Sequence, residues 1–130
     1  MFGRRRARPP RPIVDDGTLR VVARAFEVER GDGAALDQLA EAGHDSARPV
    51  LLRHVFAIRP DAEDEQVDRL VGGLGADGFE VTRPEPDRLH AASTVVPTVL
   101  ATAQARARMT GLTTRHPVDY LGWEALVPSG

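Results

Sequence analysis

The stretch that decides the fold is Pro49-Val-Leu-Leu-Arg-His-Val-Phe-Ala-Ile58, a dense apolar run introduced by a proline. Its length and its β-branched and aromatic residues are typical of a mostly buried β-strand. Both flanks carry turn residues, with a Gly-His-Asp-Ser tract before the run and Pro60 after it. The sequence therefore predicts that residues 50–58 form the central strand of a sheet.

A helix and a second strand are predicted directly after this run. Pro60 and Asp61 signal a helix start, and further carboxylates follow in the first turn, where they complement the positive end of the helix dipole. The apolar stripe of this helix consists of Val67, Leu70, Val71 and Leu74. Residues 79–82 then alternate apolar and polar side chains, which predicts a strand that Pro84 and Pro86 end.

The C-terminal part repeats the same order of signals. Residues 88–95 predict another strand, and Pro97 at a first helical position opens a helix that runs to about residue 110 and ends at Gly111. Residues 112–127 predict the last strand, in which Pro117 marks an edge, a bulge or a break. The side of the helix expected to be buried consists of Val99, Leu100, Ala103 and Ala107.

From residue 50 the predicted order is β-α-β-β-α-β, so we expect an α+β fold of the ferredoxin-like type. In that plan the sheet is antiparallel, the first strand lies between the third and the fourth, and both helices cover one face. The other face of the sheet is then the natural binding surface.

The residues that precede the central strand predict helices. The apolar residues at helical spacing are Leu19, Val22, Ala23 and Phe26, and a second short helix is expected over residues 34–42, ended by Gly43. We therefore expect three parts: a disordered Arg- and Pro-rich tail over residues 1–16, a helical segment over 17–43, and the ferredoxin-like domain over 44–130.

Length and composition favour one folded domain. The chain has 130 residues, of which 42% are hydrophobic and 28% charged, as in ordinary globular proteins. It has no cysteine, which excludes disulfides, thiolate catalysis and cysteine-ligated zinc, and which fits a reducing cytoplasm. No signal peptide and no run of about 20 apolar residues is present, so we expect a cytoplasmic protein without a membrane partner.

The net charge of −2 conceals an asymmetry, because the first twelve residues hold five arginines and no acid. Every basic residue in the chain is an arginine, which reflects the codon bias of a high-GC, bacterial genome and weakens any argument from arginine alone. A short basic terminus is most often a solubilising leader, but clustered arginines also bind RNA by displacing its counterions. The candidate nucleic-acid contacts are Arg4, Arg5, Arg6, Arg8 and Arg11.

Several motifs resemble sites but fit structural roles better. Gly73-Leu-Gly75-Ala-Asp-Gly78 has the letters of a dinucleotide-binding loop, yet it ends a predicted helix instead of opening one. His44-Asp45-Ser46 is a turn, because adjacent residues cannot form a catalytic triad. The remaining histidines, His54, His90 and His116, are predicted on three neighbouring strands. They could converge on a metal or form an acid–base cluster, but histidines on strands are more often hydrogen-bonded structural residues. We predict no catalytic residue, no metal and no cofactor.

Two groups of residues are candidates for binding a partner. The first is the acidic helix start, whose common interpretation is a solvated helix end: Asp61, Glu63, Asp64 and Glu65. The second is Tyr120 with Trp123, the only tyrosine and the only tryptophan in the chain. Core packing and a hydrophobic anchor for a protein partner are equally good interpretations of this pair, and its burial decides between them.

At three places the chain resembles the regulator of ribonuclease activity B (RraB) family. The first place is Leu39-Ala-Glu-Ala-Gly-His-Asp45, which leads into Arg53-His-Val-Phe56. The others are Gly78-Phe-Glu-Val-Thr-Arg-Pro-Glu85 and Asp119-Tyr-Leu-Gly-Trp-Glu124. Their order and spacing agree over residues 35–126, whereas residues 1–34 have no counterpart in the resemblance.

This resemblance implies a non-enzymatic protein that binds the scaffold region of the endoribonuclease RNase E and dampens RNA cleavage. In that case the acidic helix start, with Tyr120 and Trp123 as anchors, would contact basic segments of the scaffold. One alternative is an RNA- or ribosome-binding protein that acts through the basic tail. A second is a small cofactor-independent enzyme in which two ferredoxin-like chains pair into an α+β barrel. The oligomeric state is not predicted.

Overall fold

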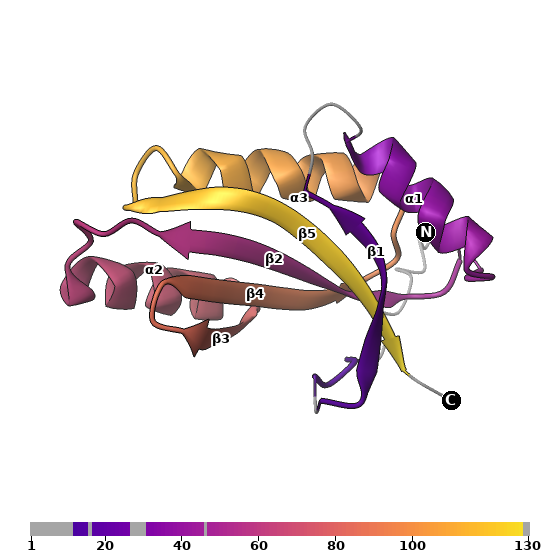
Figure 1. The fold of residues 1–130 in the computed structure, drawn as a ribbon, viewed down its shortest axis with the longest axis horizontal. Coiled ribbons are helices and arrows are strands. Elements are labelled where there is room, and N and C mark those ends of the chain that lie inside the picture. The colour runs from indigo at the N-terminus through magenta and orange to yellow at the C-terminus, as the bar shows by residue number, and fades with distance from the viewer. Residues whose placement is uncertain (1–11, 16, 27–30, 46, 129–130) are drawn as a thin grey trace, which may run out of the picture.

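The computed structural model describes residues 12–15, 17–26, 31–45 and 47–128. Within these residues the chain forms an α+β fold with one five-stranded antiparallel sheet and three helices (Figure 1). In chain order the elements are β1 (Leu19–Ala25), α1 (Gly31–Glu41), β2 (Val50–Ile58), α2 (Asp64–Ala76), β3 (Glu80–Glu85), β4 (Arg88–Val95), α3 (Val99–Leu112) and β5 (Val118–Pro128).

Strand β2 is the central strand, as its apolar run predicts. The strands follow one another in the order β1-β5-β2-β4-β3, so β2 pairs with β5 on one side and with β4 on the other. The middle position of β2 in this order confirms that residues 50–58 form the central strand. Seven of the nine residues of β2 are buried, which is why the run is apolar on both faces.

The predicted helix over residues 19–26 is wrong, because residues 19–25 form strand β1 and pair with β5. The register of this pair shifts between Val21 and Ala23. Leu19 and Val21 therefore pack on one face of the sheet, whereas Ala23 and Ala25 pack on the other. This bulge breaks the regular alternation of a strand and leaves apolar spacings that imitate a helix.

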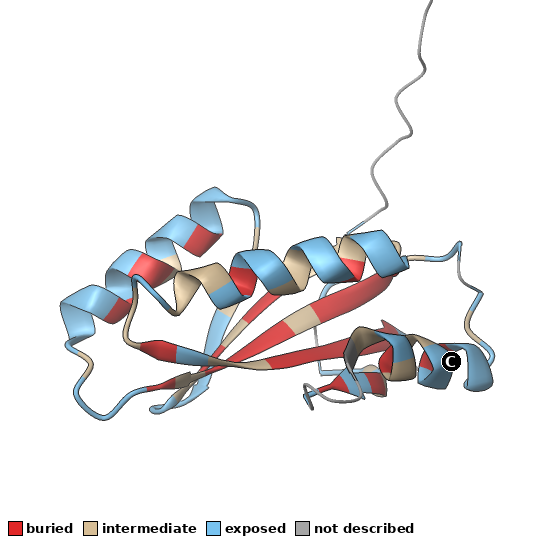
Figure 2. Ribbon diagram, turned by 90° about the horizontal axis from the view of Figure 1, so that it is seen from above, coloured by how far each residue is buried: buried red, intermediate tan, exposed pale blue. Residues whose placement is uncertain are grey.

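All three helices cover the same face of the sheet, and Figure 2 shows buried residues on their inner sides. Alternate β2 side chains reach this face. Val50 and Leu52 pack with Ala35 and Leu39 of α1, and Phe56 packs with residues of α2 and α3. Since α1 also lies on this face, the helical layer contains one helix more than the ferredoxin-like plan requires.

The buried side of α3 differs from the prediction. Val99 and Leu100 are 72% and 67% exposed, and Ala103 and Ala107 are exposed as well. Thr102 and Met109 are the buried residues instead. The helix is apolar on more than one side, because alanines occur all around it, so periodicity could not identify the inner face. The helix begins after Thr98, whose hydroxyl accepts a hydrogen bond from Ala101 N at 3.0 Å, and not at Pro97.

The opposite face of the sheet carries no helix in the described part of the chain. Its apolar centre is formed by Leu51, Ala92 and Leu126, which are buried. Leu19 and Val21 of β1 pack against this cluster, and so does Ile13 from the segment 12–15. A short stretch of chain therefore contacts the face that the sequence marks as a binding surface.

Candidate functional site

The four predicted acidic residues lie together and are exposed. Asp61 belongs to the turn after β2, Glu63 precedes α2, and Asp64 and Glu65 begin the helix. The backbone N–H of Glu63 donates to Gln66 Oε1 at 3.0 Å, and Glu65 pairs with Arg69 one turn further at 3.4 Å. These contacts fix the helix start and leave most of its carboxylate oxygens open to solvent. We call these residues, Asp61, Glu63, Asp64 and Glu65, the acidic helix start.

The predicted aromatic anchors point into the protein. Trp123 has no exposed surface, and its indole Nε1 donates to Asp32 Oδ1 of α1 at 2.9 Å. Tyr120 is half-buried, and its hydroxyl lies 2.9 Å from Nδ1 of His54. Because burial decides between the two interpretations of this pair, the structure favours core packing for Trp123.

These aromatic residues belong to a buried polar network between the sheet and the helices. Asp32 accepts from Arg106 Nε of α3 at 2.8 Å as well as from Trp123, and Arg106 also donates to Ala25 O at 2.7 Å. The guanidinium of Arg106 lies 5.6 Å from the centre of the Tyr120 ring. One carboxylate of α1 therefore ties this helix to α3 and to β5.

Burial keeps the imidazole of His54 and the hydroxyl of Tyr120 uncharged. The pKa of His54 is lowered to about 4, mainly by burial and also by the nearby positive charge of Arg106, while the carboxylate of Asp32 has a smaller, opposite effect. Burial also raises the pKa of the Tyr120 hydroxyl far above its usual value. At neutral pH both groups are neutral hydrogen-bonding partners, which suits a structural role better than proton transfer.

The three histidines do not converge. His54 faces the helices, whereas His90 is paired opposite Val55 and faces the other side of the sheet. His116 lies in the turn before β5. In the described ranges no group of three or more histidine and carboxylate side chains could hold a metal ion. The Gly73–Gly78 motif ends α2 and leads into β3, as predicted from its position.

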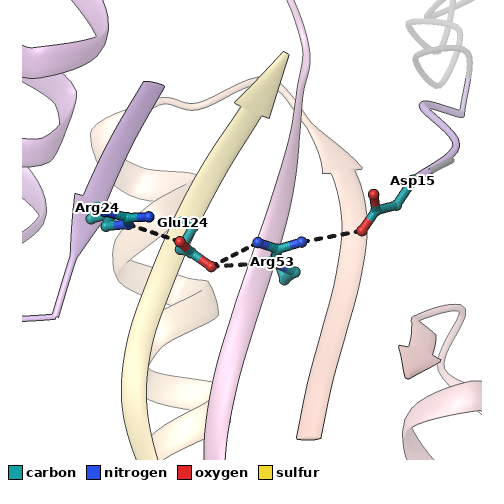
Figure 3. A network of polar contacts seen from close by, with 4 residues as sticks. All are labelled: Asp15, Arg24, Arg53 and Glu124. Carbon is teal, nitrogen blue, oxygen red and sulfur yellow. Dashed lines mark hydrogen bonds and ion pairs between the residues drawn. The ribbon is translucent and has the colours of Figure 1, made fainter. Parts of the chain in front are cut away.

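A row of four charged side chains crosses the other face of the sheet (Figure 3). Glu124 of β5 accepts from Arg24 of β1 at 2.9 Å and from Arg53 of β2 at 2.9 and 3.2 Å. Arg53 Nη1 also donates to the carboxylate of Asp15 at 3.2 Å. Burial alone would raise the pKa of Glu124, but the hydrogen bonds from Arg24 and Arg53 offset it and hold that pKa below its usual value.

Sequence reasoning missed this row. A usable signal exists, because Arg53 is the only charged residue in the run 50–58 and Glu124 is the only one in residues 120–127. Opposite charges that stand alone in two apolar strands suggest a cross-strand pair. The register that places Arg53 directly opposite Glu124 requires knowledge of the strand pairing.

Fold and side chains together define a small α+β domain with a row of ion pairs on one sheet face and an exposed acidic helix start. A family model described as regulator of ribonuclease activity B matches residues 29–125, and the chain belongs to this family of regulatory proteins. Comparisons with curated proteins and with solved structures found no match. The resemblance stated from the sequence is therefore confirmed.

Two further predictions concern the surroundings of the protein. The candidate nucleic-acid contacts Arg4, Arg5, Arg6, Arg8 and Arg11 lie outside the described residues. A bilayer-spanning helix is absent from the part of the chain that the structure describes, since none there is both long and apolar enough.

Proposed function

We propose that this protein is a non-enzymatic regulator of RNA decay that binds the scaffold region of RNase E through the acidic helix start. The family assignment supports the regulatory part of this proposal. The exposure of all four carboxylates at one helix end supports the position of the contact. Basic, disordered scaffold segments would bind these carboxylates and would then hold less RNA.

The single observation that carries the choice of surface is the difference between the two groups of candidates. The aromatic pair is occupied inside the protein, with Trp123 held by Asp32 and Tyr120 by His54. The acidic helix start is exposed, and its carboxylates are close enough to act on one basic segment. The contact is therefore mainly electrostatic and lacks a large apolar anchor at this helix end.

Removing two of these charges should weaken scaffold binding. We expect the variant with Asp61→Asn and Asp64→Asn to bind the RNase E scaffold region about threefold to thirtyfold more weakly at about 0.1 M salt, because each exposed charge contributes about 0.3–1 kcal/mol. Fluorescence anisotropy with a labelled scaffold segment measures the dissociation constant. Binding should also weaken as salt rises, since exposed charges are screened.

The matched control removes the same charge elsewhere. Asp37 and Glu41 are exposed on α1, so the variant with Asp37→Asn and Glu41→Gln has the same net charge as the first variant. This control should bind the scaffold within twofold of the original chain, by the usual size of a remote charge effect. Equal weakening by both variants, or binding that is insensitive to salt, would contradict a contact at the acidic helix start.

The basic tail supports a second function, direct binding of RNA or of the ribosome. The observation that favours this function is the presence of five arginines within residues 1–12. Replacing all five with glutamine should abolish binding to a single-stranded RNA in this case and leave scaffold binding by the folded domain intact. The enzyme alternative loses support, because His54 is packed between Tyr120 and Phe79 while His90 lies on the other face.

A further inference from the structure

The sheet face opposite the helices is contacted by a short segment of the same chain. Residues 12–15 precede β1 and form no helix or strand. The backbone N–H of Ile13 donates to Thr94 Oγ1 of β4 at 2.7 Å, and its side chain packs against the apolar cluster of Leu51, Ala92 and Leu126. We call residues 12–15 the N-terminal strap.

The strap places alternate side chains on the sheet. Ile13 and Asp15 are both partly buried, whereas Val14 between them is 64% exposed. Ile13 contacts the apolar cluster, and Asp15 reaches Arg53 (Figure 3). A hollow of about 260 Å³ continues beside Pro12 and Ile13, along Ser93 and Thr94 to Glu80. The face therefore contacts the apolar residue and the acid of the strap and leaves the residue between them exposed.

The charges of the sheet itself call for an anion at the position of Asp15. The strands contribute two guanidiniums, Arg24 and Arg53, and one carboxylate, Glu124, to the charged row. With the strap in place the side chain of Arg53 is only 18% exposed, so Asp15 and Glu124 compensate its charge more than solvent does. Asp15 supplies the second carboxylate of the row, and without it Arg53 retains free hydrogen-bond donors next to an apolar cluster.

We propose that this face is a docking surface for an extended acidic segment of a partner protein, with an apolar residue two positions before an aspartate or glutamate. The N-terminal strap occupies the same surface in the free protein and must leave before the partner segment binds. This surface lies opposite the helical layer that includes α2, and the inference does not rest on the contact proposed for RNase E.

The surroundings favour a peptide over a nucleic acid. Thr94 accepts a hydrogen bond from the backbone N–H of Ile13, and the apolar cluster contacts the Ile13 side chain. A polypeptide offers both of these groups. The single acid of the partner segment is expected at Arg53, where Asp15 lies, whereas a chain with a charge on every unit would also place negative charges beside Glu80, which lines the hollow. The strap also competes strongly, because a segment tethered by a short linker has an effective concentration on the order of millimolar.

A peptide added in trans tests the proposal. The probe is a fluorescein-labelled peptide with the sequence of residues 12–17, Pro-Ile-Val-Asp-Asp-Gly. The full chain with Ile13→Ser and Asp15→Asn has a weakened strap, and we expect it to bind the probe at least about tenfold more tightly than the original chain does. Amide chemical shifts of Leu51, Ala92 and Thr94 should change on titration.

Control variants separate docking from a general change in the protein. Val14→Ser alters an exposed strap residue and should leave probe binding as weak as in the original chain. Adding Arg53→Gln or Thr94→Val to the weakened strap should each reduce binding, and Thr94→Val leaves the pair of Arg53 with Glu124 intact. Failure of the probe to bind the weakened-strap chain, binding unaffected by both additions, or tighter binding of a single-stranded RNA at the same amides would overturn the proposal.

Discussion

Replacing Gly122 with alanine is expected to lower the free energy of unfolding by about 2–4 kcal/mol, which is a large effect for the addition of one methyl group. Gly122 has a φ of +131°, which side chains of L-residues rarely adopt. A Cβ at this position would lie 2.2 Å from the carbonyl oxygen of Ala25 and 2.8 Å from Cα of Phe26. Both atoms belong to the backbone, so a side-chain rotation cannot relieve the contact.

Urea denaturation of the Gly122→Ala variant measures this loss. The matched control is Gly72→Ala, since Gly72 lies inside α2 and a Cβ there meets no atom within 4 Å. We expect this control to raise stability by about 0.5–1 kcal/mol, because alanine favours the helix over the unfolded chain. If Gly122→Ala were as stable as the original chain, the close approach of β1 to β5 would be refuted.

Gly122 also shows what the sequence can and cannot reveal about the fold. Strand β2 and helix α2 are predictable, because their apolar patterns match one period and their ends carry proline, carboxylate and glycine signals. The edge strand β1 is not predictable in the same way. The strand contains a bulge, and its partner β5 lies about 100 residues further along the chain. Only the pairing of these two segments shows that residues 19–25 are a strand.

The candidate sites also differ in whether they depend on local sequence or on contacts between distant segments. The acidic helix start is a local feature, so the helix signals that locate α2 also locate its carboxylates on the surface. The charged row and the buried network depend on contacts between distant segments, such as Asp15 with Arg53 and Asp32 with Trp123. Trp123 illustrates the limit: its residue type suits both a core and an interface, and only burial distinguishes them.

His54 should make the protein less stable in mild acid. Its pKa is about 4 in the folded protein and about 6.5 in the unfolded chain, so the unfolded chain binds the proton more readily between these values. Stability is therefore lost as pH falls from about 6.5 to about 4. We expect a loss of about 2 kcal/mol between pH 7 and pH 5 from this residue, measured by urea denaturation at both values.

Replacing His54 with asparagine tests the origin of this loss, because the amide can still meet the Tyr120 hydroxyl and does not titrate. The variant should lose about 2 kcal/mol less stability between pH 7 and pH 5 than the original chain loses, even if its stability at pH 7 is lower. His116→Gln is the comparison, since His116 is less buried and its lowered pKa contributes less. Glu124 acts in a lower pH range, because its folded pKa lies below the usual carboxyl value and its contribution is lost only as pH falls through that range. An unchanged slope between pH 7 and pH 5 in the His54→Asn variant would mean that His54 is accessible to protons in the folded state, and the buried network would then not exclude water from the centre of the fold.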